Sequence, residues 1–325
     1  MKTLLASTAI LAATAGIAAA EIAVTGSARM GIIDTFGDTG PQFSSRVRIV
    51  FTGSGETDTG LSFGASMRAD QFGGHNSTDS DGDTVGNSGT TNGDSSVYIS
   101  GGFGKLSMGD VDGAANAATG QVDGVGYTGL ADLNEVTYLS NGGSDFDGSS
   151  SIGLDDPQDT SVLYEYAAGD FSLYLSSTQI DVATGAEGMS VAAKYTTGAY
   201  AVSLGYENLD AQDSYEWEQF VLGGSATFGG VTLKAIYADG KNNQGDEWKQ
   251  HALSATYTAD ALSVTAFVSD DEDMLSNDLG TSSSAQAYGL GASYDLGGGA
   301  KVMGGYVKND TADTNAVDLG LSFSF

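Results

Sequence analysis

The chain contains 325 residues, and its 12 Lys and Arg against 42 Asp and Glu give a formal net charge of −30 at pH 7. This acidic balance excludes nucleic acid as a natural partner, because phosphate binding requires clustered Lys and Arg. The absence of Cys excludes a fold stapled by disulfides, and the 48 Gly with only 2 Pro favour β-structure over a disordered chain.

The N-terminal segment has the features of a secretory signal peptide. Lys2 precedes an apolar run that extends from Leu4 to Ile17, and three Ala follow at 18–20 as a cleavage site. The run is shorter than the roughly 20 apolar residues that a membrane-spanning helix needs. We therefore expect residues 1–20 to be a signal peptide that is removed on export, and residues 21–325 to form one domain.

Apolar and polar residues alternate in the segments that follow. Segments 22–32, 43–52 and 61–68 each place apolar side chains on one face and polar side chains on the other. A period of two residues predicts β-strands with one dry face. No later segment contains about 18 uninterrupted apolar residues, so a membrane protein with this sequence would be a β-barrel.

Further strands with the same alternation bring the predicted total to about sixteen. They lie at 95–102, 104–110, 160–168, 170–179, 188–197, 199–208, 218–229, 231–239, 248–259, 261–269, 284–296, 299–308 and 315–325. Very short links alternate with long acidic links at 70–94, 111–159, 209–217, 239–247 and 269–283. This alternation is typical of an up-and-down barrel in the outer membrane, with turns on one rim and loops on the other.

An even number of strands brings both ends of the barrel wall to the same side, so that the first and last strands can pair. Closure removes sheet edges, which hydrocarbon does not tolerate.

A soluble sandwich and a calcium-binding solenoid are the alternatives, but a sandwich has shorter strands and the chain lacks the fixed short repeat of a solenoid. The sequence therefore predicts an all-β, 16-stranded antiparallel transmembrane β-barrel.

Four segments resemble the general-diffusion porins of Gram-negative bacteria, most closely the alphaproteobacterial, Rhodobacter-like type. They are Glu21–Ala28 (EIAVTGSA), Gly104–Asp110 (GKLSMGD), Gly129–Tyr138 (GLADLNEVTY) and Leu319–Phe325 (LGLSFSF). The last pattern is shared by many outer-membrane barrels and resembles the signal that the barrel-insertion machinery reads, with Phe325 as its final residue. It therefore indicates the outer membrane rather than one function.

The resemblance implies a homotrimer in which each monomer encloses a water-filled channel. It also implies that the third external loop folds inward and narrows the channel, and that loop corresponds to residues 111–159. This is the longest link in the chain. It lacks the Pro-Glu-Phe-Gly-Gly signature of enterobacterial porins, which leaves its detailed path open.

The four Arg of the chain lie in the first three predicted strands. They are Arg29, Arg46, Arg48 and Arg68, and the alternation of each strand places every one on the polar face. A lumen position is expected, because Arg on the lipid face costs about 2–4 kcal/mol near the midplane. We interpret these residues as a basic wall at the pore constriction, with ordinary solvated lumen residues as the alternative.

The acidic side of the constriction is expected on the inward loop. The candidates are Asp112, Asp123, Asp132 and Glu135, although most acids in a Gly- and Asp-rich loop are merely solvated. Opposed charges across a narrow opening create a transverse field that orients water and solutes. Our hypothesis is therefore that the constriction selects small hydrophilic solutes by this field and by the width of the opening.

Other acidic clusters indicate weaker contacts with cations. Residues 79–83 and 270–273 are suited to Ca²⁺ bound loosely among oxygen ligands, or to divalent bridging with lipopolysaccharide. The first cluster departs from the EF-hand pattern, because Thr84 stands where Gly is required. Tyr residues near strand ends, Tyr138 among them, are expected in the interfacial girdles of aromatic side chains.

The residue inventory argues against an enzyme. Residues 60–64 (GLSFG) match the nucleophile-elbow pattern, but they lie inside an alternating strand rather than a strand-turn-helix. His75 and His251 are the only His, and with no Cys they provide no zinc ligand set.

Three classes of barrel remain: a general porin, a substrate-specific channel with a saturable site, and an adhesin or structural barrel with a closed lumen. Small polar residues on the inner face favour the first two.

Overall fold

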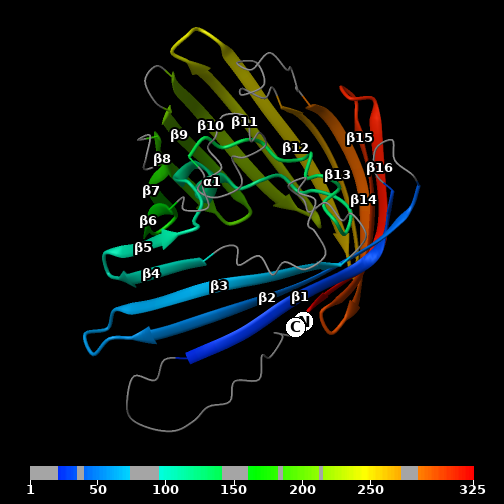
Figure 1. The fold of residues 1–325 in the computed structure, drawn as a ribbon, viewed down its shortest axis with the longest axis horizontal. Coiled ribbons are helices and arrows are strands. Elements are labelled where there is room, and N and C mark those ends of the chain that lie inside the picture. The colour runs from blue at the N-terminus through cyan, green and yellow to red at the C-terminus, as the bar shows by residue number, and fades with distance from the viewer. Residues whose placement is uncertain are drawn as a thin grey trace.

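The computed structural model describes residues 21–34, 40–73, 95–140, 160–181, 186–211, 215–271 and 285–325. These ranges contain sixteen antiparallel strands that form a closed barrel, in which β1 pairs with both β2 and β16 (Figure 1). The strands are β1 (Glu21–Asp34), β2 (Gln42–Glu56), β3 (Ser62–Gly73), β4 (Ser95–Gly101), β5 (Gly104–Gly109), β6 (Thr160–Ala168), β7 (Phe171–Asp181), β8 (Ala186–Thr197), β9 (Tyr200–Ala211), β10 (Tyr215–Phe228), β11 (Val231–Asn242), β12 (Glu247–Ala259), β13 (Leu262–Asp271), β14 (Ala285–Gly297), β15 (Ala300–Asn309) and β16 (Thr314–Ser324). The expected fold is confirmed. Residues 1–20, the expected signal peptide, lie outside the described ranges.

The two faces of the barrel wall differ as the alternation predicts. On the outer face Leu204, Leu290 and Leu319 are 57%, 58% and 62% exposed, whereas Ser203 and Asp318 on the inner face are 5% and 4% exposed. Successive strand residues point to opposite faces, so the pairing register that places apolar side chains outside also places polar side chains inside. An apolar outer surface over a polar interior is the pattern of a barrel that stands in lipid.

Tight turns join the strands on one rim. Gly229 and Gly230 connect β10 to β11, and both have positive φ, at 55° and 82°. A two-residue hairpin of this kind requires positive φ at both central positions, which glycine adopts without steric cost. The expected short links therefore have the local conformation that their sequence favours.

Residues 111–140, which we call the inner segment, run within the ring of strands in Figure 1. They include the short helix α1 (Ala114–Thr119), which contacts β7, β8, β9 and β10. The remaining part of the predicted loop, residues 141–159, lies outside the described ranges. Within those ranges, no helix has the length and apolar character of a membrane span.

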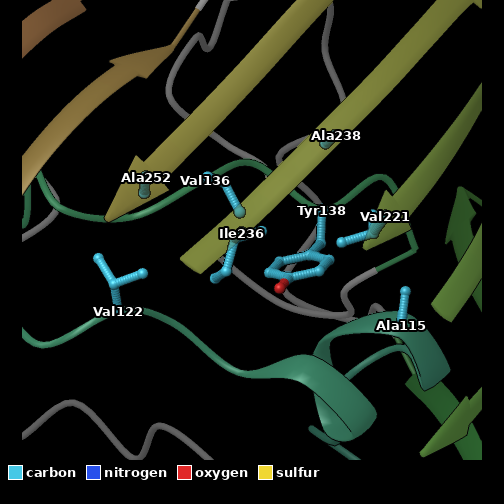
Figure 2. Close-up of a cluster of buried hydrophobic side chains, with 8 residues drawn as sticks. All are labelled: Ala115, Val122, Val136, Tyr138, Val221, Ile236, Ala238 and Ala252. Carbon is cyan, nitrogen blue, oxygen red and sulfur yellow. The ribbon is translucent and has the colours of Figure 1, made fainter. Parts of the chain in front are cut away.

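Apolar side chains attach the inner segment to the wall. Figure 2 shows Tyr138 of the inner segment packed among Val221 of β10 and Ile236 of β11, and all three are at most 5% exposed. The Tyr138 hydroxyl donates a hydrogen bond to the Gly120 carbonyl at 2.6 Å. The expectation that Tyr138 belongs to an interfacial girdle is therefore wrong, because this residue lies in the packed interior.

Candidate functional site

The four Arg lie together on the inner face of β1, β2 and β3, as their strand positions predict. Arg29 stands opposite Arg46 in the β1–β2 register, and Arg48 stands opposite Asp70 in the β2–β3 register. Arg68 lies on the same face of β3 as Asp70, two residues earlier. The predicted basic wall is thus one continuous patch.

Asp70 is the carboxylate that this patch holds. It receives a forked contact from Arg48, with Nε to Oδ1 at 3.0 Å and Nη2 to Oδ2 at 2.8 Å. Arg68 Nε lies 3.2 Å from Oδ2, and Asp70 is 3% exposed. The planar guanidinium matches a carboxylate in two-point geometry, so Asp70 orients Arg48 as well as offsetting part of its charge.

Arg29 and Arg46 differ in their contacts. Arg29 Nη1 donates to the carbonyl oxygens of Tyr127 and Thr128 at 3.3 and 3.0 Å, which joins the wall to the inner segment. Arg46 has no ion pair or hydrogen bond to another residue in the described part of the chain. Its guanidinium is therefore the least compensated cation of the patch.

Asp318 of β16 anchors the middle of the inner segment. Its Oδ2 accepts hydrogen bonds from the Tyr127 amide at 2.9 Å, the Thr128 amide at 2.8 Å and the Thr128 hydroxyl at 2.7 Å. Its Oδ1 accepts from the Gly305 amide at 2.9 Å. One carboxylate thus satisfies four donors that would otherwise be buried without partners.

Glu207 of β9 anchors the end of the inner segment. It is fully buried, and it accepts from the Leu139 amide at 3.2 Å, the Ser140 amide at 3.1 Å and the Ser140 hydroxyl at 2.6 Å. Gln219 donates to the same carboxyl group at 3.1 Å. A buried carboxylate is tolerated when several donors surround it, as they do here.

The remaining anchors extend around much of the wall. Hydrogen bonds and ion pairs among the described residues join the inner segment to β1, to β7 through β13 and to β16. The smaller contacts include Ala114 to Ser176, Ala115 to Ser190, Thr119 to Ser203, Asp123 to Ser254 and Thr137 to Gln250. Arg48 and Arg68 of the basic wall remain partly exposed, at 28% and 30% of their side chains.

The predicted acids occupy different places along the inner segment. Asp123 does not meet the basic wall, because its Oδ1 pairs with Lys234 of β11 at 2.7 Å and its Oδ2 accepts from Thr256 of β12 at 2.9 Å. Asp132 is near enough to Arg29 to attract it electrostatically, and it adopts a left-handed backbone with φ of 46°. The Glu135 side chain is exposed.

Asp112 is exposed inside the barrel, and Asn116 donates to it at 3.2 Å. The surrounding wall displaces bulk water, and this desolvation raises the pKa of Asp112, with a further rise from the charges of Asp110 and Glu165. Desolvation also raises the pKa of Asp110, whereas Arg68 opposes that rise. Asp110, the residue directly before the inner segment, therefore interacts electrostatically with Arg68 of the basic wall.

Sequence reasoning did not single out Asp70, Asp110, Glu207 or Asp318. Asp70 was expected in a loop, but β3 continues to Gly73, so Asp70 lies on the same face as Arg68. Glu207 and Asp318 stand on the polar face of their strands, which is the one signal that could have identified them. Nothing in the alternation tells which lumen-facing acid is covered by the inner segment.

No group of His, Cys, Asp and Glu among the described residues is arranged to hold a metal ion. Residues 79–83, one of the two acidic clusters suggested for Ca²⁺, lie outside the described ranges. Residues 270 and 271 end β13, and the rest of the second cluster lies outside those ranges.

A closed sixteen-stranded wall with an apolar outer face and a charged interior defines a transmembrane β-barrel channel. Comparison with known proteins agrees, since a model of the Gram-negative porin family matches residues 6–314. A porin of Rhodobacter capsulatus is 37% identical over 94% of this chain and 100% of its own length, and a porin of Fuscovulum blasticum is 27% identical over 87% and 91%. A porin structure refined at 1.8 Å has a TM-score of 0.74 and 35% identity, covering 94% of this chain and 100% of that one.

The chain therefore belongs to the Gram-negative porins, and it is a non-enzymatic general porin channel of the outer membrane.

Proposed function

We propose that the inner segment is the third external loop of the channel, and that charges at the constriction it forms select among the ions and small hydrophilic solutes that diffuse through. The observation that carries this proposal is the partly exposed basic wall. The inner segment is bound to the wall from β7 to β13, to β16 and to Arg29 of β1, so the passage lies between it and β2 to β6.

The charges across this passage are opposed. Arg46, Arg48 and Arg68 line one side, and Asp110 and Asp112 stand where the inner segment leaves β5. Low-dielectric walls focus the field between such groups, so that dipolar water and polar solutes are oriented as they pass. An apolar solute must displace this oriented water, which favours hydrophilic solutes.

Arg46→Gln combined with Arg48→Gln tests the proposal. We expect the reversal potential in a KCl gradient across a planar bilayer to shift towards cation selectivity, because two positive charges leave the passage. Lys301→Gln is the matched control, since Lys301 also lies on the inner face but belongs to β15. An unchanged reversal potential in the double Arg variant would contradict selection by charge.

Three further proposals concern export and assembly. Residues 1–20 are removed as a signal peptide, three chains assemble as a homotrimer, and the C-terminal pattern ending in Phe325 is read by the barrel-insertion machinery. The apolar run in residues 4–17 and the likeness to porins support them. We also propose that acidic loops contact lipopolysaccharide through divalent cations. Mass spectrometry of the purified protein tests the first proposal, and its mass in detergent tests the trimer.

A substrate-specific channel with a saturable site is the second candidate function. One observation favours it, namely a basic recess in the wall beneath α1.

A further inference from the structure

A recess of about 170 Å³ opens between the end of α1 and the inner face of β8 to β11. Thr119 and Gln121 of the inner segment form one side, and Lys194, Ser225 and Lys234 of the strands form the other. Its strand residues lie towards the tight-turn rim, whereas Glu207 and Gln219, which hold the inner segment, lie further along the same strands. The recess is therefore separate from the basic wall of β1 to β3.

Two ammonium groups enter this recess from different strands. Lys194 stands opposite Ser203, Ser203 opposite Gly223, and Ser225, two residues along β10, opposite Lys234. Three strand spacings of about 4.8 Å separate β8 from β11, so the two backbones are roughly 14 Å apart. Long Lys side chains from both walls can reach one small ion between them.

The charges of the two Lys are compensated unequally. Lys234 Nζ lies 2.7 Å from Asp123 Oδ1, and its other two N–H groups remain for a further acceptor. Lys194 makes no ion pair or hydrogen bond with another residue in the described part of the chain. Among the described residues, the recess therefore has two cations, Lys194 and Lys234, and one anion, Asp123. The hydroxyl of Ser225 adds an uncharged hydrogen-bond donor.

The walls of the recess are held in place. The Gln121 side chain donates to the Val136 carbonyl at 2.8 Å and accepts from the Val136 amide at 3.0 Å. Thr119 and Ser203 share a hydroxyl hydrogen bond of 2.8 Å. Gly223 allows this close approach, because a Cβ there would lie 2.3 Å from Thr119 Cγ2. The cavity is thus preformed rather than created by a ligand.

We propose that this recess is a binding subsite for a small oxyanion, such as phosphate or the carboxylate end of an organic acid. Its volume of about 170 Å³ has room for several water molecules, and therefore for an anion of phosphate size. Ammonium groups bind oxyanions as point charges, and hydroxyl groups add donors. A solute that passes the basic wall meets a second cationic surface on the tight-turn side of the inner segment.

This proposal rests on the channel function proposed above, because the anion must enter the lumen to reach Lys194. The test is a titration of inorganic phosphate in planar bilayers at constant KCl activity, with single-channel current as the readout. We expect a saturable decrease of the current in the wild-type channel. Lys194→Met should raise the half-saturating phosphate concentration about tenfold, since one charge-assisted contact is lost.

Two further variants keep the test specific. Lys301→Met removes an inner-face cation outside the recess and should leave the phosphate titration unchanged. Ser225→Leu fills the recess without changing its charge and should abolish saturation. A Lys194→Met channel that conducts KCl is folded, so an unchanged titration in it, or no saturation in the wild type, overturns the subsite. A repeat with succinate shows whether carboxylates bind as well, and saturation by either anion supports the proposal.

The two proposals fail separately. If the double Arg variant keeps its reversal potential while Lys194→Met raises the half-saturating phosphate concentration, selection at the basic wall is wrong and the subsite stands. The reverse pattern removes the subsite and leaves the constriction intact.

Discussion

Replacing Glu207 with Ala is expected to release the end of the inner segment from the barrel wall. The substitution removes the acceptor of three inner-segment donors: the amides of Leu139 and Ser140 and the hydroxyl of Ser140. Glu207 is fully buried, so these donors do not regain partners while the segment stays docked. They find water only if residues near 140 move into the lumen.

The magnitude follows from the cost of unpaired buried donors. Each costs about 1–3 kcal/mol, so the three together destabilise the docked position by at least about 3 kcal/mol. Since about 1.4 kcal/mol changes an equilibrium tenfold, the ratio of docked to released segment falls by roughly two orders of magnitude. Asp318 still holds Tyr127 and Thr128 in this variant, so the release is confined to the second half of the segment.

Single-channel recording measures the effect. We expect Glu207→Ala to have larger current fluctuations and a higher mean conductance, because the released residues alternate between the wall and the lumen. Glu165→Ala is the control, since Glu165 is an inner-face carboxylate that pairs with Lys105 at 3.1 Å and acts on the inner segment only through its charge near Asp112, with no hydrogen bond to that segment among the described residues. If Glu207→Ala conducts as quietly as Glu165→Ala, the carboxylate does not hold the segment and the reasoning fails.

Three other substitutions or conditions test separate parts of the structure. Leu204→Arg places a cation on the outer face and should cost about 2–4 kcal/mol of folding free energy; urea titration in lipid vesicles measures this cost, and an equal loss in Leu204→Met would contradict a lipid-facing position. Acidification should shift the selectivity towards anions, and this shift should begin at a pH above the usual pKa of Asp. The pKa values of Asp110 and Asp112 are raised, so both carboxyl groups become neutral before an ordinary Asp does as the pH falls. Protonation also relieves the desolvation cost of these two groups, so their contribution to stability rises at low pH. Reversal potentials of the wild type and of a double Asp-to-Asn variant across this pH range provide the comparison, and identical profiles would exclude these acids. Tyr138→Phe should destabilise the protein by about 1–3 kcal/mol, because the Gly120 carbonyl loses its buried donor; a thermal unfolding midpoint equal to that of the wild type would contradict this role.

The strands could be predicted because each crossing imposes the same chemical requirement. Lipid on one face and water or polar groups on the other force a period of two, which needs no knowledge of the neighbouring strand. The predicted strand ends were least accurate where a strand extends past its apolar outer band. β3 continues to Gly73 and β11 to Asn242, past the predicted ends at 68 and 239, because the outer face carries no clear apolar signal there.

The site could be predicted only in part. Arg48 and Arg68 were placed on the inner face by alternation, but their shared partner Asp70 depends on the β2–β3 register, which alternation does not specify. Asp123 was expected to face these Arg, and it instead pairs with Lys234. The path of the inner segment depends on contacts between residues far apart in sequence, and no local pattern encodes them.

The anchoring of the inner segment also orders the assembly of the channel. Tyr127 and Asp318 are 191 positions apart, and Asp318 belongs to β16, the same strand that closes the barrel against β1. Contacts of such long sequence separation form late, because the intervening chain must first be placed. An incomplete barrel therefore lacks both its last strand and the anchor for the middle of its inner segment, and closing the barrel supplies both in one step.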